Sequence, residues 1–283
     1  MQALPQNDVS APVTDGGIAS ATRFISISNQ KGGVGKTTTT VNLATALAAV
    51  GKKVLVVDLD PQGNASTGFG VDRADRVNGT YEVLFGDCGI DEAVLGTKVP
   101  NLYIISSSIH LSGAEIELVD TKRREYRLKD ALAVATQKFD YVMFDCPPSL
   151  NLLTLNALVA SNGVLVPLQC EFYALEGLSH LVKTIERVKG AFNDDLELTG
   201  VVLTMYDKRN NLANQVSDNV RSFFGDKVFE TVIPRNVRIS EAPSFGLPAI
   251  VYDMHCPGSQ AYIQLAKEML KREQQIQAAQ AAA

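Results

Sequence analysis

Several features are scarce in this sequence, and each scarcity excludes a class of protein. The four cysteines include no Cys-x-x-Cys pair and the three histidines are scattered, so neither a zinc site nor a disulfide framework is indicated. No apolar run approaches the roughly 18 residues that a membrane span requires. Residues 1–22 contain no Lys or Arg ahead of an apolar segment, as a secretory signal would. We therefore expect a protein of the reducing cytoplasm.

Basic residues are also scarce relative to acidic ones. The chain has 26 Lys and Arg against 31 Asp and Glu, a formal charge of −5. Any binding to nucleic acid or anionic lipid must therefore come from a local patch. Gly and Pro follow no period and 46% of the residues are hydrophobic, which excludes collagen, coiled coil and disorder. The length of 283 residues suits one large globular domain or at most two small ones.

Seven short runs rich in β-branched residues are predicted to form strands. Several are apolar at nearly every position, which is typical of strands covered on both faces, and helical patterns lie between most of them. We therefore expect an α/β fold with a mostly parallel twisted sheet flanked by helices on both faces. The predicted strands are residues 24–28, 54–58, 102–106, 141–145, 163–168, 198–205 and 228–233.

The predicted helices and the composition of the ends define one domain, residues 23–273. Residues 1–22 are polar and are expected to form a disordered tail, and the Gln- and Ala-rich residues 274–283 are expected to fray. We find no linker and no internal repeat. The predicted helices are residues 37–50, 113–136, 150–160, 175–189, 212–224 and 259–275.

The segment between the first strand and the first helix carries the strongest functional signal. It reads Asn-Gln-Lys-Gly-Gly-Val-Gly-Lys-Thr-Thr over residues 29–38. Small residues let the backbone curl so that successive N–H groups point inward, and the helix directs its positive end to the same place. This pattern predicts a phosphate-binding loop of the P-loop NTPase type. The residues expected to bind the nucleotide are Lys31, Gly32, Gly33, Val34, Gly35, Lys36, Thr37 and Thr38.

Two side chains of this loop have predicted chemical roles. Lys36 is expected to neutralise β- and γ-phosphate oxygens of ATP, and the Thr37 hydroxyl to complete the shell of a Mg²⁺ ion. The loop departs from the common GxxxxGK[ST] form, because Gln30 replaces its first glycine and Lys31 follows. Lys31 cannot easily fold back onto its own crowded phosphates but can extend to a nucleotide held by a second subunit. We therefore predict a dimer that sandwiches ATP, with a solvated Lys31 as the alternative.

With this loop, the sequence resembles the ParA/MinD family of ATPases, whose deviant Walker A loop has the same two lysines. Three further segments resemble the chromosomal ParA (Soj) branch: residues 57–66 (VDLDPQGNAS), 145–149 (DCPPS) and 234–244 (PRNVRISEAPS). The resemblance implies ATP-dependent chromosome or plasmid partitioning. An ATP- and Mg²⁺-dependent homodimer would bind double-stranded DNA without sequence preference, and slow hydrolysis, stimulated by a ParB-type centromere-binding protein, would release it. It also implies a cytoplasmic, nucleoid-associated location.

Three acidic residues lie at the ends of predicted strands. Asp58 is the last residue of the second strand, Asp60 follows it closely, and Asp145 ends the fourth strand, so all three are expected at the carboxyl edge of the sheet. The resemblance implies that Asp60 is the catalytic acid that orients water and that Asp145 holds Mg²⁺ through water. Asp58 is either a functional acid or the cap of a turn. The expected catalytic residues are Lys31, Lys36, Asp60 and Asp145, and the expected magnesium site is Thr37, Asp60 and Asp145.

Two further groups of residues follow strands or switches. Met205, Pro234 and Asn236 lie where relatives in the family wrap the adenine, and the alternative is that they only pack the edge of the core. Pro147 and Pro148 fix φ in the second switch. They either make the loop respond as a unit to loss of the γ-phosphate or form a rigid turn before the next helix.

A locally basic region is predicted between residues 205 and 240. Its six basic and four acidic side chains sum to +2, and a dimer would double the patch, which favours DNA binding without sequence preference. The resemblance matches Arg209 and Arg238 to arginines that contact the DNA backbone. The alternative is a solvated face, as expected for the basic cluster at residues 122–129, where acidic residues are interspersed.

Two other functions are weaker alternatives. A MinD-like membrane-cycling ATPase needs an amphipathic terminal helix, but beyond Leu270 the only large apolar residue is Ile276, so we expect no membrane partner. A redox protein resembling the nitrogenase iron protein needs two cysteines per subunit, and Cys88 and Cys146 do not lie in that family's pattern. The final helix is expected to dock on the core through Tyr262, Leu265, Ala266 and Met269.

Overall fold

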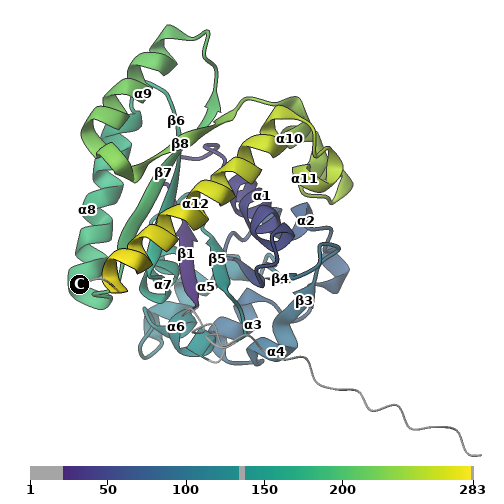
Figure 1. Cartoon of the computed structure of the whole chain (residues 1–283). Helices are drawn as coiled ribbons and strands as arrows, with labels where there is room; N and C mark the ends of the chain where they lie inside the picture. The colour runs from purple at the N-terminus through teal and green to yellow at the C-terminus, as the bar shows by residue number, and fades with distance from the viewer. Residues whose placement is uncertain (1–21, 134–137, 282–283) are drawn as a thin grey trace, which may run out of the picture.

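The computed structural model describes residues 22–133 and 138–281, so the predicted N-terminal tail lies outside it except for Thr22. Over these residues, eight strands form one sheet in the order β3-β4-β2-β5-β1-β6-β7-β8 (Figure 1). Neighbouring strands are parallel except β3 and β4, which are antiparallel. The strands are β1 (Arg23–Ile27), β2 (Val54–Asp58), β3 (Val94–Gly96), β4 (Leu102–Ile105), β5 (Tyr141–Asp145), β6 (Gly163–Gln169), β7 (Glu197–Tyr206) and β8 (Val228–Pro234).

The structure confirms the mostly parallel α/β fold and all seven predicted strands, each within one residue at either end. Alternate residues of each central strand serve opposite faces: in β2, Val54 and Val56 pack on one face, whereas Leu55 and Val57 pack on the other. Because both faces are covered, the strands read as unbroken apolar runs. The edge strand β3 was not predicted, since three residues are too short to show a period.

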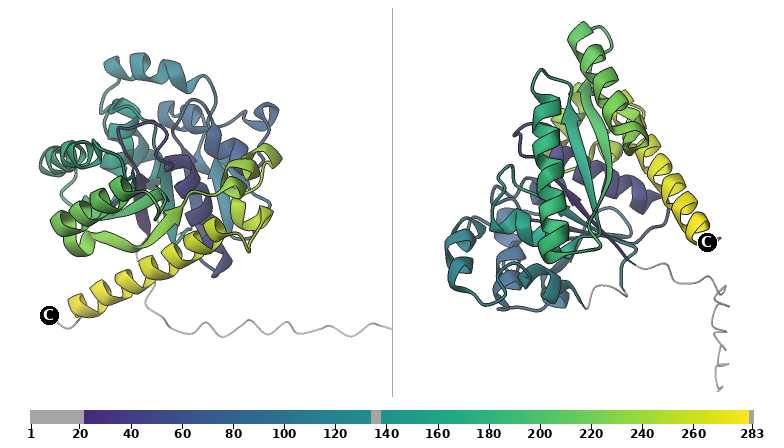
Figure 2. Two further views of the ribbon diagram at one scale, coloured as in Figure 1. Left: turned by 90° about the horizontal axis from the view of Figure 1, so that it is seen from above. Right: turned by 90° about the vertical axis from the view of Figure 1, so that its left-hand side faces the viewer.

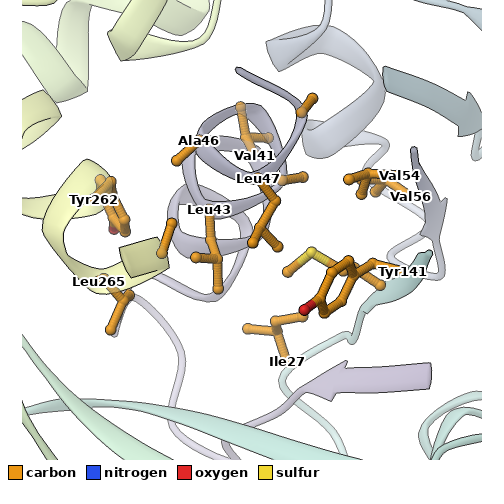
Figure 3. Close-up of a cluster of buried hydrophobic side chains, with 14 of the residues drawn as sticks. Ile27, Val41, Leu43, Ala46, Leu47, Val54, Val56, Tyr141, Tyr262 and Leu265 are labelled. Atoms are coloured by element: carbon orange, nitrogen blue, oxygen red, sulfur yellow. The ribbon is translucent and has the colours of Figure 1, made fainter. Parts of the chain in front are cut away.

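Helices cover both faces of the sheet. One face packs against α1 and α12, whose apolar side chains meet in the cluster of Figure 3. The other face packs against α3 to α9, and Figure 2 shows α8 and α12 on opposite sides of the strands. The helices are α1 (Lys36–Ala49), α2 (Asn64–Gly68), α3 (Thr80–Phe85), α4 (Ile90–Ala93), α5 (Leu111–Glu117), α6 (Arg127–Leu132), α7 (Leu152–Ala160), α8 (Ala174–Phe192), α9 (Asn211–Phe224), α10 (Val237–Glu241), α11 (Ala249–Tyr252) and α12 (Pro257–Ala281), with 3₁₀ turns η1 (Arg73–Asp75), η2 (Leu118–Asp120), η4 (Gly225–Lys227) and η5 (Ala242–Phe245).

The prediction of one helix over residues 113–136 was wrong. The chain instead forms α5, η2 and α6, with residues 134–137 outside the described part. Arg123 takes a φ of +55°, a left-handed conformation that no α-helix continues, and its guanidinium forms two hydrogen bonds with Asp130 (3.1 and 3.0 Å). The four- to six-residue helices α2, α3, α4, α10 and α11 were not predicted, because so few residues show no helical period.

The final helix packs as expected. Tyr262, Leu265, Ala266 and Met269 are buried against the core, and the Tyr262 hydroxyl lies 3.2 Å from that of Thr39 in α1. The helix continues to Ala281, past the predicted end at residue 275, so it stays regular through most of the segment expected to fray. The side chains of residues 274–279 are exposed. None of the described helices is long and apolar enough to span a bilayer.

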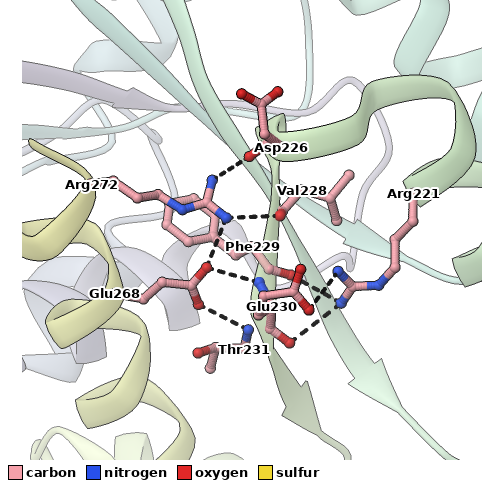
Figure 4. Close-up of polar contacts among 8 residues, drawn as sticks. All are labelled: Arg221, Asp226, Val228, Phe229, Glu230, Thr231, Glu268 and Arg272. Carbon is pink, nitrogen blue, oxygen red and sulfur yellow. Dashed lines mark hydrogen bonds and ion pairs between the residues drawn. The ribbon is translucent and has the colours of Figure 1, made fainter. Parts of the chain in front are cut away.

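The edge strand β8 is covered by charged side chains of two helices (Figure 4). Glu268 of α12 accepts hydrogen bonds from the backbone N–H groups of Glu230 (2.8 Å) and Thr231 (2.9 Å). Arg272 of α12 and Arg221 of α9 donate to carbonyl groups of the strand and of the turn before it. These bonds satisfy groups that an open sheet edge would offer to another chain.

Candidate nucleotide-binding site

The predicted phosphate loop connects β1 to α1 and has the expected curled backbone. Gly33 and Gly35 have φ values of +74° and +89°, in the left-handed region that favours glycine. Gly35 is also the N-cap of α1, so the first free N–H groups of the helix face the loop. Thr204 of β7 supports the loop from outside by donating a hydrogen bond to the Val34 carbonyl (2.8 Å).

Lys36 lies inside this loop and is 7% exposed. Its ammonium donates a hydrogen bond to the Lys31 carbonyl across the loop (3.1 Å). Burial lowers the pKa of Lys36, and the acidic groups of Asp145, Cys146 and Asp60 partly oppose that change. An anion bound in the loop would stabilise the charged form of this lysine, so the site is compatible with an anionic ligand.

Asp145 is fully buried at the end of β5, beside Asp58 in the register of β2 and β5. The Thr40 hydroxyl donates to Oδ1 of Asp145 (3.0 Å), whereas Oδ2 has no hydrogen-bond partner among the described residues. Burial and the neighbouring Asp58 raise the pKa of Asp145, and the hydroxyls of Thr37 and Thr40 lower it. A buried carboxylate oxygen without a partner, close to a threonine hydroxyl, fits the hydration shell of Mg²⁺.

The two acids at the end of β2 have different surroundings. Asp58 is fully buried and accepts hydrogen bonds from the Ser66 backbone (2.8 Å), the Ser66 hydroxyl (2.7 Å) and the Asp60 backbone (3.2 Å). Burial raises its pKa to about 6, although the Ser66 bonds oppose the shift. Asp60 is half-buried, and its Oδ1 accepts from the backbone of Gln62 (3.0 Å). The geometry favours the turn-capping interpretation for Asp58 and leaves Asp60 nearer the surface.

Lys31 lies on the outside of the loop. Its side chain is 47% exposed, and its ammonium contacts the carboxylate of Glu171, in the turn between β6 and α8. The next two residues, Phe172 and Tyr173, are 74% and 70% exposed and contact each other edge to face. Lys31 and Lys36 therefore have separate surroundings, one at the surface and one inside the loop.

The residues predicted to contact adenine lie at the carboxyl ends of β7 and β8. Met205 has a φ of +50°, and its Cε would be 3.8 Å from a Cβ built on Gly35, so it lies against the loop. Pro234 ends β8 opposite Tyr206 of β7. The side chain of Asn236 accepts a hydrogen bond from the backbone of Arg238 (3.0 Å) and so caps α10. The adenine contacts stay a prediction.

The two predicted DNA-binding arginines are exposed and ion-paired. Arg209 forms two hydrogen bonds to Asp207 (3.0 and 2.9 Å), which hold the pKa of Asp207 at about 2. Arg238 lies 3.0 Å from Glu241 and 3.6 Å from Asp253. Arg221 belongs to the same predicted basic patch, but its guanidinium donates to carbonyl groups of the edge strand β8. It is therefore less available to DNA than the charge of +2, summed over residues 205–240, implies.

The segment that carries Arg238 is attached to the helix of the phosphate loop. The backbone N–H of Ala249 in α11 donates to the buried Asn42 side chain of α1 (2.8 Å). A Cβ on Gly246 would lie 2.9 Å from the Cα of Gly70, so the turn before α11 also packs directly on the turn after α2. The segment that carries Arg238 is therefore packed directly against α1, the helix that follows the loop, and against the turn after α2.

Comparisons with known proteins cover most of the chain. A family model described as an AAA domain matches residues 22–198. The chromosome partitioning protein ParA of Caulobacter vibrioides is 57% identical over 262 residues, covering 92% of this chain and 98% of that protein. The sporulation initiation inhibitor protein Soj of Bacillus subtilis is 54% identical over 247 residues, covering 87% and 98%. The chain belongs to the ParA/Soj family.

A solved structure extends the comparison to the fold. The cobyrinic acid a,c-diamide synthase of Mycobacterium smegmatis, with bound ADP and magnesium, is 37% identical and superimposes with a TM-score of 0.79, covering 89% of this chain and 96% of that one. The ParA proteins of Caulobacter vibrioides and Myxococcus xanthus, 57% and 52% identical over 92% and 91% of this chain, are chromosome partitioning proteins, which supports the ParA reading over the MinD-like alternative. The redox alternative gains no support, because Cys146 is buried in the core and burial raises its pKa.

Several residues of this ParA/Soj-family site were not found by sequence reasoning. Thr40, Ser66 and Glu171 each contact a predicted site residue. Ser66 lies within the quoted segment 57–66, which also contains Asp58 and Asp60, so its place in that segment was a usable signal. Glu171 carries no such signal, since it is 140 residues from Lys31.

Proposed function

We propose that this ParA/Soj-family chain is a partitioning ATPase in which ATP joins two subunits that together bind DNA. The observation that carries the proposal is the separation of the two loop lysines. Lys36 is buried within the loop and Lys31 extends from its outer face. A single bound nucleotide needs only the buried lysine, whereas the outer lysine suits phosphates presented by a second subunit.

Within one subunit, the proposed nucleotide is MgATP. The backbone of residues 32–35 and the start of α1 bind the phosphates, and Lys36 neutralises their charge. The Thr37 hydroxyl and Asp145 would hold Mg²⁺, and the Oδ2 of Asp145, which has no partner among the described residues, is available to its hydration shell. The metal supplies charge stabilisation on the β- and γ-phosphates. Asp60 orients the attacking water, and hydrolysis is slow until a ParB-type partner stimulates it.

The ion pair of Lys31 and Glu171 must open when the subunits join. An exposed ion pair of this kind contributes about 0.2–1 kcal/mol, so a neighbouring triphosphate can replace Glu171 as the partner of Lys31. Loss of the γ-phosphate removes part of that attraction, and the equilibrium returns toward separate subunits. The closed pair uses Arg209 and Arg238 on the DNA backbone, which gives affinity without base specificity.

Lys31→Ala is expected to leave ATP binding intact and to abolish ATP-dependent dimerisation. The change removes the group that reaches the partner's phosphates but leaves Lys36 in place. Light scattering with ATP, ADP and no nucleotide measures the mass, and calorimetry measures nucleotide affinity. Lys267→Ala, at an exposed position of α12, is the matched control and should dimerise normally. An ATP-dependent dimer in the Lys31 variant would contradict the proposal.

Arg238→Ala is expected to weaken binding to random-sequence DNA and to make its salt dependence shallower by roughly one to two phosphate contacts per dimer. ATP-dependent dimerisation should be unchanged, because Arg238 forms its ion pairs with Glu241 and Asp253, within its own segment. Co-sedimentation with DNA at several salt concentrations, with liposomes in parallel, measures both. Arg187→Ala, at an exposed position of α8, is the control.

An unchanged salt dependence in the Arg238 variant would show that Arg238 is an ordinary solvated side chain with no contact to DNA. Retention of the protein on liposomes would instead favour the membrane-cycling alternative.

A further inference from the structure

We infer that Asp58 is a positioning residue for ATP hydrolysis: it acts through Asp60 by fixing the turn that carries this acid. The inference rests on the proposed function, since it presumes that Asp60 orients the attacking water. Asp58 itself faces no open space. It is fully buried, and both of its carboxylate oxygens accept hydrogen bonds from the chain that follows it.

The carboxylate of Asp58 joins both ends of the turn. Oδ1 accepts from the backbone of Asp60 (3.2 Å), and Oδ2 accepts from the backbone (2.8 Å) and the hydroxyl (2.7 Å) of Ser66, in the first turn of α2. The backbone carbonyl of Asp58 is held in turn by the Thr80 hydroxyl (2.8 Å). Ser66 and Thr80 are both fully buried. The start and the end of the segment 60–66 are therefore tied to one side chain.

Ser66 extends this connection to the neighbouring strand. Its hydroxyl donates to Asp58 and accepts from the backbone of Ser107 (3.0 Å), two residues after the end of β4. The carboxyl ends of β2 and β4 and the start of α2 are thus linked by consecutive hydrogen bonds. Because the Ser66 hydroxyl both donates and accepts a hydrogen bond within this buried network, its orientation is fixed.

The outer side of the turn is held by a second group, the guanidinium of Arg76. It donates to the carbonyl of Gly63 (3.3 Å) and to the hydroxyl of Thr67 (2.8 Å). Gly63 has a φ of +63°, and a Cβ at this position would collide with the Arg76 guanidinium. Asp60 is carried between these anchors, and its own Oδ1 is bound to the Gln62 backbone (3.0 Å). The backbone that positions Asp60 therefore has little freedom while Asp58 is intact.

These contacts distinguish positioning from metal binding. Three donors already use the two oxygens of Asp58, whereas Oδ2 of Asp145 has no partner in the described chain. Asp145 is therefore the acid left available to a hydrated cation. Removing the Asp58 charge would leave buried N–H groups of the turn poorly bonded and would let Asp60 move relative to the nucleotide.

The test compares Asp58→Asn and Ser66→Ala with the matched control Asp140→Asn. Asp140 also accepts a backbone hydrogen bond, from Lys53 (2.7 Å), but it directly precedes β5 and so lies at the amino-terminal ends of the strands, away from the candidate site. We expect Asp58→Asn to lower the single-turnover hydrolysis rate by about tenfold to a hundredfold, and Ser66→Ala by a smaller factor. ADP affinity by calorimetry should be unchanged in all three variants. Asp140→Asn should hydrolyse at the normal rate even if its unfolding temperature falls.

A double-mutant cycle with Asp60→Ala separates positioning from a general loss of structure. If Asp58 acts through Asp60, adding Asp58→Asn to Asp60→Ala should lower the rate no further. An additive loss, or a normal rate in both the Asp58→Asn and Ser66→Ala variants, would overturn the inference. If Asp58→Asn does not fold, a normal rate in Ser66→Ala alone overturns it. Normal hydrolysis by Asp60→Ala alone would instead refute the proposed role of Asp60, so the two failures are distinguishable.

Discussion

Lys36→Ala is expected to abolish nucleotide binding. The ammonium of Lys36 is the charged group inside the phosphate loop, where it is nearly buried and bound to the Lys31 carbonyl. Hydrogen bonds between charged partners in such a site are strong, so we expect the affinity for ATP and ADP to fall by at least about 100-fold, or roughly 2.7 kcal/mol. Calorimetric titration with each nucleotide measures the loss.

The calorimetric titration of Lys36→Ala needs a control for folding, because the variant also loses the hydrogen bond from the Lys36 ammonium to the Lys31 carbonyl. Lys267→Ala should bind both nucleotides normally, and the thermal unfolding of Lys36→Ala without nucleotide should resemble that of the parent chain. Added ATP should raise the unfolding temperature of the parent but not that of Lys36→Ala. Tight ATP binding by Lys36→Ala would show that the loop is not the phosphate site.

The sheet was largely predictable from the sequence because its strands are buried on both faces. Runs such as residues 54–58 and 141–145 are apolar at nearly every position, and their bounds agree with β2 and β5. The helices between residues 111 and 132 were not predictable, because the interruption depends on one residue, Arg123, in a left-handed conformation. Short elements such as α10 depend on local caps, here Asn236, and on packing that a periodic pattern does not record.

The arrangement of the candidate site was predictable where its residues are close in the sequence or end parallel strands. Residues 31–35 form the turn before α1 and residues 36–38 begin that helix, whereas Asp58 and Asp145 meet because parallel neighbouring strands end at the same edge. Contacts across the chain were not predictable, since they depend on the packing of separate elements. Glu171 meets Lys31 only because β6 lies beside β1 in the sheet, and Asn42 meets Ala249 only after α11 packs on α1.

The capping role of Asp58 shows why residue type alone does not assign chemistry. Asp58, Asp60 and Asp145 all lie at the carboxyl edge of the sheet, yet their oxygens have different partners. Asp58 is fully used by backbone and hydroxyl donors, Asp145 has one oxygen without a partner in the described chain, and Asp60 is the least buried. These differences support the structural, metal-holding and water-orienting roles that we propose for Asp58, Asp145 and Asp60.

Asp60→Ala is expected to bind ATP and dimerise but to hydrolyse ATP at least about 100-fold more slowly. Lys36, Thr37 and Asp145 remain to hold the nucleotide and its metal, so binding should persist while the attacking water loses its orientation. Phosphate release in a single turnover measures the rate, and light scattering should find an ATP-dependent dimer that lasts longer than that of the parent. Asp75→Ala, an exposed acid in η1, should hydrolyse normally. Normal phosphate release by Asp60→Ala would remove this residue from the mechanism, whereas failure to bind ATP would instead place it in the nucleotide site.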